Sequence, residues 1–170
     1  RAGGGGGAHR LRILPRIRPA SEPPGRRLLG VPSRPMSVAL PDHVRRFLDG
    51  PRHAVITTID DDGSPQVALV WYERDGDAIL LNSARGRRWP TNLLRDPRIA
   101  VVVAEGADWV SLRGRVTVDA DPERALDDII RFAHRYDPEG AAARAAIWQD
   151  QERITFRLEP ERVRVEIGVY

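Results

Sequence analysis

The chain has 170 residues, of which 41% are hydrophobic and 30% charged, the composition of a soluble globular protein with a single domain. It contains no cysteine, so disulfides and thiolate metal sites are excluded. The four histidines are scattered without metal-ligand spacing, and we therefore expect no metal site.

The positive charge is concentrated at one end of the chain. Every one of the 27 basic residues is an arginine, and residues 1–35 hold eight of them against one glutamate, a net charge of +7. Residues 36–170 hold 19 arginines against 23 acidic residues, a net charge of −4. Non-specific nucleic-acid binding depends on surplus cations, so we expect no nucleic-acid partner for this domain.

Residues 1–35 are rich in Gly, Pro and Arg and show no periodic apolar pattern, which predicts a disordered extension. Met36 is the only methionine, and we expect the native domain to span 36–170, with a basic interaction arm as the alternative use of the extension. The pair of arginines in "GRRLLG" is not followed by the apolar region of an export signal. No segment is long and apolar enough for a membrane span, so we expect a cytoplasmic protein without a membrane partner.

The first half of the domain predicts one helix and then strands. Apolar spacing and the Gly-Pro stop favour a short helix in 40–50. The β-branched run 53–59, the "DDDG" turn at 60–63 and the run 65–73 predict a hairpin. A second turn, "RDGD", leads into the run 78–83, which predicts a three-stranded meander.

The second half alternates between strands and helices. Residues 98–105 predict a strand, and 109–119 predict a strand with one solvated face, whose valines and leucine at 110, 112, 116 and 118 share a parity. Asp121 is an N-cap for a helix over 121–137, with an apolar stripe formed by Leu126, Ile129, Ile130 and Ala133. An alanine-rich helix over 139–148 is expected to pack closely.

The C-terminal residues show the clearest alternation of the chain. Apolar residues occupy every second position over 154–158 and again over 163–169, on either side of Pro160. This pattern predicts two half-buried strands or one broken strand. The total of six or seven short antiparallel strands with inserted helices indicates a mainly β protein, a small barrel with helices at its margins.

The segment Ser83–Arg98, "SARGRRWPTNLLRDPR", places five arginines between two strands. Pro90 is tolerated only in the first turn of a helix, so a strand end here feeds a short helix. The positive end of that helix then faces Arg85, Arg87 and Arg88, an arrangement that favours an anion. The alternative is a solvated arginine-rich connector with no ligand.

The order of these motifs resembles a known family. The segments "AVITTIDDDGSPQVALVWYERDGDAILLNSARGRRWPTNLLRDPRIAVVV", "WVSLRGRVTV" and "ITFRLEPERVRVEI" resemble the pyridoxamine 5′-phosphate oxidase-like split β-barrels, within them the actinobacterial branch that uses the deazaflavin coenzyme F420. The resemblance covers about residues 40–166. It implies a homodimeric split barrel of six or seven antiparallel strands with short peripheral helices and a cofactor at the dimer interface.

The resemblance also implies site residues. Basic and polar groups where the third strand meets the short helix would hold the cofactor phosphate, the strand before that one would run beneath the ring, and a partner-subunit segment would close the site. In this chain the phosphate groups are Ser83, Arg87, Arg88 and Asn92, and Trp89 among them is a further cofactor-binding residue. The ring strand contributes Val67, Leu69 and Trp71, and the closing segment contributes Asp108 and Trp109.

The chain departs from the family pattern at two places. The family commonly has a lysine two residues after the first arginine of its cluster, where this chain has Trp89 followed by Pro90, so Arg88 is expected to act as the planar phosphate binder. The flavin-phosphate motif of the true pyridoxamine-phosphate oxidases is absent. That particular oxidation is therefore not expected.

Several residues keep two interpretations. Trp71 shares a parity with Val67 and Leu69 and is either core or a wall of the ring pocket. Trp109 is either a cofactor contact or a dimer contact. Arg113 and Arg115 are either solvated or reach the acidic tail of a coenzyme bound across the dimer.

No nucleophile with a base, paired carboxylates or metal-ligand set emerges, so no catalytic side chain is expected and the cofactor would perform the chemistry. We therefore predict an oxidoreductase, a reductase that transfers a hydride between coenzyme F420 and a small unsaturated organic substrate. Two alternatives stay open: an FMN-dependent oxidase or reductase on the same fold, and a non-catalytic carrier or sensor of flavin, deazaflavin or haem.

Overall fold

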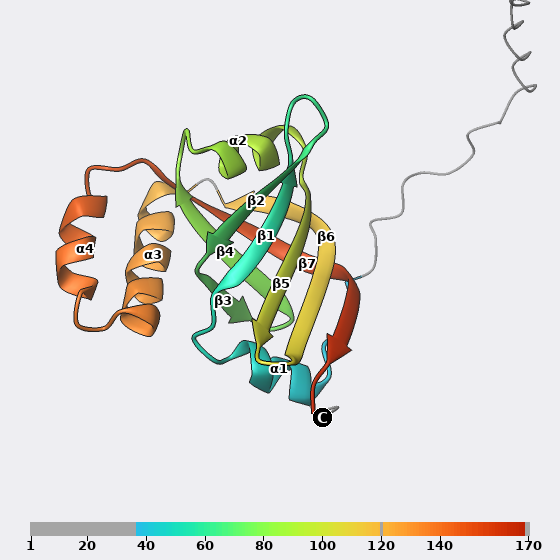
Figure 1. Ribbon diagram of the computed structural model, residues 1–170. Helices are drawn as coiled ribbons and strands as arrows, with labels where there is room; N and C mark the ends of the chain where they lie inside the picture. Colours follow the sequence, from blue (N-terminus) through green and yellow to red (C-terminus); the bar gives the residue numbers. More distant parts are fainter. Residues whose placement is uncertain (1–36, 120, 169–170) are drawn as a thin grey trace, which may run out of the picture. The chain divides into compact units, whose positions relative to one another are not determined.

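The computed structural model describes residues 37–119 and 121–168. The predictions about residues 1–35 and Met36 lie outside this part of the chain. Helices and strands follow one another in the order α1(Asp42–Leu48), β1(Ala54–Ile59), β2(Pro65–Val70), β3(Tyr72–Asp75), β4(Ala78–Ala84), α2(Arg88–Arg95), β5(Arg98–Glu105), β6(Asp108–Asp119), α3(Pro122–Tyr136), α4(Ala141–Trp148) and β7(Arg153–Glu166) (Figure 1).

The strands form one antiparallel sheet in the order β2-β1-β5-β6-β7-β4-β3. The two edge strands, β2 and β3, are consecutive in the chain and are separated only by Trp71. The sheet therefore curls so that its edges approach each other, as the ribbon shows (Figure 1). The prediction of a mainly β split barrel with short peripheral helices is confirmed.

The predicted meander is wrong in one respect. The run 65–73 is interrupted at Trp71, and its second part, β3, pairs with β4 rather than lying beside β2. The hairpin β1-β2 is present, with a turn that places Gly63 at a φ of 84°. The sequence of residues 65–73 contains no local signal for the break at Trp71, because β3 is separated from β2 by its long-range place at the other edge of the curled sheet.

The C-terminal alternation forms one strand, β7, which continues through Pro160. A β-bulge at Arg113/Gly114 of β6 lies opposite this proline. A Cβ on Gly114 would approach the carbonyl oxygen of Glu159 to 2.9 Å, so the close pairing there requires glycine. Beyond the bulge the valines of β7 are only partly buried or exposed, in contrast to the fully buried Phe156.

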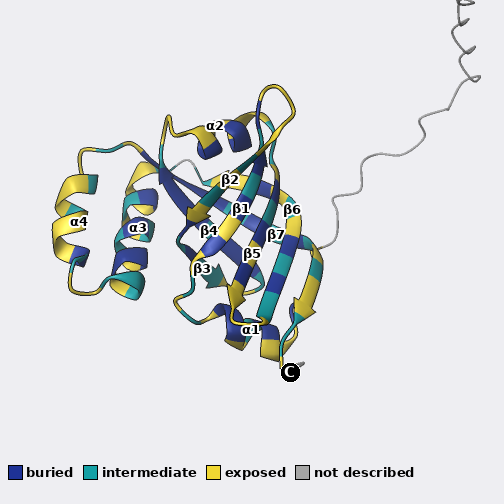
Figure 2. Ribbon diagram, in the orientation of Figure 1, coloured by how far each residue is buried: buried dark blue, intermediate teal, exposed yellow. Residues whose placement is uncertain are grey.

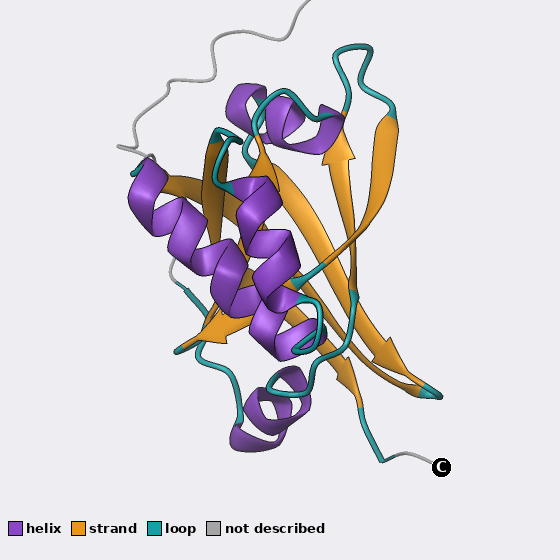
Figure 3. Ribbon diagram, turned by 90° about the vertical axis from the view of Figure 1, so that its left-hand side faces the viewer, coloured by secondary structure: helices purple, strands orange, loops and turns teal. Residues whose placement is uncertain are grey.

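The helices lie around the barrel. Helix α2 packs against β1 and β2 at one end of the barrel, and α3 and α4 lie together beside it, with α3 against β4 and β7 (Figure 3). The Asp121 carboxylate accepts hydrogen bonds from the backbone N–H groups of Glu123 and Arg124, so the predicted N-cap is confirmed. The expected close packing of α4 is wrong, because Ala141 is its only fully buried residue.

The core fills the interior of the curled sheet (Figure 2). It combines alternate residues of β1, β5 and β6 with both parities of β4 and the first half of β7. On α3 the buried residues are Ala125, Ile129, Phe132 and Ala133, whereas the predicted stripe members Leu126 and Ile130 are half-buried. Val118 of β6, expected inside, is 41% exposed near the end of its strand. Within the described residues, no helix is both long and apolar enough to cross a membrane.

Candidate functional site

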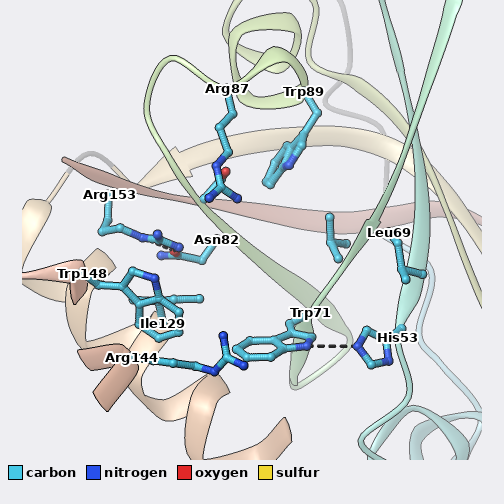
Figure 4. A pocket seen from close by; sticks show the side chains of 12 residues that line it. His53, Leu69, Trp71, Asn82, Arg87, Trp89, Ile129, Arg144, Trp148 and Arg153 are labelled. Carbon is cyan, nitrogen blue, oxygen red and sulfur yellow. Dashed lines mark hydrogen bonds between the residues drawn. The ribbon is translucent and has the colours of Figure 1, made fainter. Parts of the chain in front are cut away.

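A pocket of about 390 Å³ opens where the end of β4, the start of α2 and the helices α3 and α4 meet (Figure 4). Its lining contains three arginines and a histidine but no acidic residue, which makes it an electropositive pocket. The lining residues are His53, Leu69, Val70, Trp71, Asn82, Ser83, Arg87, Trp89, Ile129, Arg144, Trp148 and Arg153.

Five of the residues predicted to form a site line this one pocket. They come from two separate segments of the chain, Leu69 and Trp71 from the end of β2 and the bend after it, and Ser83, Arg87 and Trp89 from the β4–α2 junction. The sheet brings these segments together although β2 and β4 are not neighbouring strands.

Of the three arginines Arg85, Arg87 and Arg88, only Arg87 has a side chain without a hydrogen-bond or ion-pair partner in the described part of the chain. Arg85 forms an ion pair with Glu152 at 2.8 Å, and Arg88 forms one with Asp60 at 2.6 Å. Arg87 occupies the N-cap position of α2, and its side chain extends into the pocket (Figure 4). The segment therefore contributes one available cation to the pocket rather than three.

Arg88 and Asn92, which were also predicted to hold the phosphate, are bonded to Asp60 in the structure. Both guanidinium nitrogens Nε and Nη2 of Arg88 donate to the Asp60 carboxylate, and the Asn92 amide donates to Asp60 Oδ1 at 2.7 Å and to Thr58 Oγ1 at 3.1 Å. The hydrogen bonds from Arg88 and then Asn92 lower the pKa of Asp60. This cluster ties α2 to the end of β1, and the side chains of Arg88 and Asn92 do not line the pocket.

Asp60→Asn is expected to lower the melting temperature by a few degrees at pH 7, because it removes the countercharge of Arg88. The folded-state pKa of Asp60 is depressed, so its carboxylate stabilises the fold above the ordinary aspartate pKa of about 4, and this contribution is lost as the pH falls through the lowered pKa. The melting temperatures of the two proteins should differ at pH 7, begin to approach each other below about pH 4, and meet once the pH has fallen through the lowered pKa of Asp60. A difference in melting temperature that stays constant from pH 7 down to that range would show that the Asp60–Arg88 ion pair does not cause it.

Ser83 supplies a second unusual group. It is 2% exposed, it lines the pocket, and its Oγ has no hydrogen-bond partner within the described residues. A buried hydroxyl without a partner costs free energy, and such groups are rare in folded proteins. A ligand atom that accepts or donates a hydrogen bond at this position would remove the cost.

Arg153 and Asn82 are pocket residues that the sequence interpretation missed. Arg153, the first residue of β7, lies opposite Ala84 in the β4–β7 ladder and therefore beside the β4–α2 junction. Its guanidinium donates to Asn82 Oδ1 through Nε at 3.0 Å and Nη2 at 2.7 Å. Nothing in the local sequence distinguishes this arginine from others in alternating strands; only the sheet pairing places it near Arg87.

Trp71 forms the opposite wall of the pocket (Figure 4). Its ring stacks on Tyr136 with centroids 5.2 Å apart, and Trp148 meets it edge-on at 6.3 Å. Its indole N–H donates to His53 Nε2 at 3.1 Å. Trp71 is thus held by aromatic neighbours outside the barrel core, which favours the interpretation of a pocket wall over that of a core residue.

The remaining predicted site residues lie away from the pocket of their own chain. Val67 is 60% exposed on the outer face of β2. Asp108 accepts a hydrogen bond from the backbone N–H of Gly168, and the Trp109 indole donates to Glu166 at 3.0 Å. The predicted role of Asp108 and Trp109 requires a second subunit, and the roles of all three residues stay predictions. No group of three potential metal ligands occurs among the described residues.

The antiparallel curled sheet, with a pocket lined by arginine and aromatic side chains, defines a split β-barrel protein. A comparison with protein families matches residues 40–165 to the pyridoxamine 5′-phosphate oxidase model. The chain belongs to this family, and the resemblance drawn from the sequence is confirmed.

Individual relatives bring more detail. The chain is 30% identical, over 99 residues, to an F420H(2)-dependent biliverdin reductase from Mycobacterium tuberculosis (strain CDC 1551 / Oshkosh), a match that covers 57% of this chain and 72% of the relative. Among solved structures, an F420 reductase superimposes with a TM-score of 0.60 at 21% identity, covering 74% of this chain and 98% of the other. The haem storage protein HutZ from Vibrio cholerae superimposes with a TM-score of 0.58 at 16% identity, covering 75% of this chain and 95% of HutZ.

Proposed function

We propose that this protein is a coenzyme F420-dependent reductase that transfers a hydride between the deazaflavin and a small unsaturated organic molecule. The observation that carries the proposal is the pocket itself, in which an unpaired arginine, an orphaned buried hydroxyl and aromatic walls converge. The relative named as an F420H(2)-dependent biliverdin reductase supports the choice of coenzyme.

The residues of the pocket fit such a coenzyme. Arg87 and Ser83 would hold its phosphate at the start of α2, where the helix dipole also favours an anion. Leu69, Trp71 and Trp89 would border its ring. When bound, the deazaflavin supplies the hydride, and the side chains of this chain position it and exclude water.

The phosphate contacts do not account for tight binding by themselves. A charge-assisted hydrogen bond contributes about 1.5–3 kcal/mol and the helix dipole about 0.3–1 kcal/mol, whereas micromolar affinity needs about 8 kcal/mol net of the cost of association. The aromatic and apolar walls must supply the remainder through burial of the ring. This is why the proposal rests on the combined pocket and not on the arginines.

The protein is proposed to act as a homodimer through the outer face of β2, β1 and β5. Val55 lies directly opposite both Leu69 and Val102 in the strand ladders, and these side chains are between 36% and 68% exposed. Leu69 also lines the pocket, so a partner seated on this apolar face would close the pocket's open side. The same dimer would allow Asp108 and Trp109 of the second subunit to take their predicted place.

Val55→Arg is expected to convert this dimer into monomers, because it places a charge at the centre of the apolar face. Sedimentation velocity of the wild-type protein and the variant measures the change directly. Ile147→Arg, at an apolar position on α4 that is 63% exposed against 42% for Val55, lies away from that face, serves as the control and should remain dimeric. A wild-type protein that sediments as a monomer at all concentrations would contradict the proposed assembly.

Turnover tests the reductase assignment. Reduced coenzyme F420 is mixed with the protein and a series of conjugated acceptors, with biliverdin first because of the relative's activity, and the fluorescence of the oxidised coenzyme is followed. We expect reoxidation that needs both the protein and one of the acceptors. Turnover with reduced FMN instead would favour the FMN enzyme, and a bound coenzyme that no acceptor oxidises would favour a carrier.

A further inference from the structure

Arg153 is a buried cation without a countercharge. Its side chain lines the pocket, the residue is only 6% exposed, and it forms no ion pair with any carboxylate of the described chain. Arg88, which the sequence favours as the phosphate binder, is instead paired with Asp60 and is not among the pocket-lining residues. The charge of Arg88 is therefore compensated by a carboxylate, whereas the charge of Arg153 is not compensated by any carboxylate of the described chain.

The position of Arg153 is fixed before any ligand arrives. Nε and Nη2 donate to Asn82 Oδ1, Nη1 donates to Gln151 Oε1 at 2.9 Å, and the guanidinium lies over the Trp148 ring at 5.3 Å from its centroid. Asn82 is itself held by hydrogen bonds from its amide to the Ala125 carbonyl and Thr155 Oγ1. Three of the five N–H donors of the guanidinium are used in this way, so two are left for a ligand.

Arg153 also faces a second cation. Burial first, and then repulsion from the Arg87 guanidinium, lower its pKa to about 10. Two arginines that repel each other across one pocket raise the energy of the folded protein unless an anion lies between them. The same pocket contains the orphaned hydroxyl of Ser83, which can donate a hydrogen bond to an oxyanion.

We propose that Arg87 and Arg153, together with the Ser83 hydroxyl, form a clamp for a single phosphate-type oxyanion, and that Arg88 is not part of it. The clamp joins the N-cap of α2 to the first residue of β7, segments 66 positions apart in the chain. A planar guanidinium from each side matches the geometry of a phosphate group. This inference rests on the proposed function in assigning the phosphate to a deazaflavin coenzyme, while the clamp itself would also hold the phosphate of FMN or free phosphate.

The test compares variants of the two arginines by ligand binding rather than by turnover. Coenzyme F420 and FMN are titrated into the wild-type protein, Arg153→Gln, Arg153→Lys and Arg88→Gln with fluorescence as the readout. Inorganic phosphate is titrated in parallel, with the melting temperature as the readout. We expect Arg153→Gln to weaken binding of the wild-type protein's preferred cofactor more than tenfold and to abolish the stabilisation by phosphate.

The other variants separate the clamp from a merely structural role. Arg153→Lys keeps the charge but loses the two-pronged geometry of the guanidinium, and we expect its cofactor affinity to fall severalfold. This variant still tests the clamp if Arg153→Gln does not fold. Arg88→Gln should bind within about threefold of wild type, since the Arg88 side chain is paired with Asp60 and does not line the pocket. Double substitution of Arg87 and Arg153 by Gln should cost less than the sum of the single effects, because both contact one group.

Two outcomes would overturn the clamp: unchanged affinity in both Arg153 variants, or a loss in Arg88→Gln as large as that in Arg153→Gln. A lowered melting temperature in Arg153→Gln with undiminished phosphate stabilisation would likewise reduce Arg153 to a structural residue. If the wild-type protein binds neither cofactor but phosphate stabilises it through Arg153, the proposed function fails while the clamp stands.

Discussion

Arg87→Ala is expected to weaken the binding of coenzyme F420 more than tenfold. Its guanidinium is the one cation of the β4–α2 junction with no partner in the described structure, and it extends into the pocket. Loss of a single charge-assisted hydrogen bond corresponds to about 1.5–3 kcal/mol, which is roughly tenfold or more in the dissociation constant. Fluorescence titration of the coenzyme measures this change.

Arg85→Ala is the matched control for Arg87→Ala. It removes the same charge from the same segment, but Arg85 is paired with Glu152 and does not line the pocket. Its coenzyme affinity should stay within a few-fold of wild type. Equal losses in the two variants would mean that the segment acts only through its total charge, and the assignment of Arg87 to the phosphate would be withdrawn.

Phe156→Ala is expected to lower the free energy of unfolding by about 3–5 kcal/mol, the range for truncating a buried aromatic residue. Phe156 is fully buried in β7, and its ring lies 5.6 Å from that of Trp89, the second residue of α2, which borders the pocket. The substitution leaves a cavity beneath this wall of the site. Urea denaturation followed by circular dichroism gives the free energy directly.

Leu94→Ala provides the comparison for this core truncation. Leu94 lies on the same helix as Trp89 but is 50% exposed, so its truncation should change the free energy of unfolding by no more than about 0.5–1 kcal/mol. A loss below about 1.5 kcal/mol for Phe156→Ala would show that the packing between β7 and α2 is looser than the structure describes.

Most individual elements could be predicted because their signals are local. Apolar runs identified β1 and β5, alternating apolar residues identified β6, and Asp121 with the proline after it marked the start of α3. The break at Trp71 could not be predicted in this way. The run from 65 to 73 is uniformly suited to a strand, and only the long-range pairing of β3 with β4 reveals that the chain crosses to the other edge of the sheet.

The part of the site that has a local sequence signal could be predicted, and the part that depends on long-range contacts could not. A strand end leading into a helix is visible in sequence, so Ser83 and Arg87 could be proposed as an anion site, and both line the pocket. The choice between Arg87 and Arg88 depends on Asp60, which the sequence presents only as one residue of a turn. Arg153 lies 66 residues after Arg87 in the chain, and the pairing of β7 with β4 places it beside the β4–α2 junction. No local sequence pattern predicts that position.

Equilibrium titration of the wild-type protein with coenzyme F420 and with FMN, followed by fluorescence, tests the central claim most directly. The pocket of Ser83, Arg87 and the aromatic walls is proposed to hold the deazaflavin. We expect saturable binding of coenzyme F420, tighter than that of FMN. Tight binding of FMN with no response to coenzyme F420 would contradict the proposed cofactor.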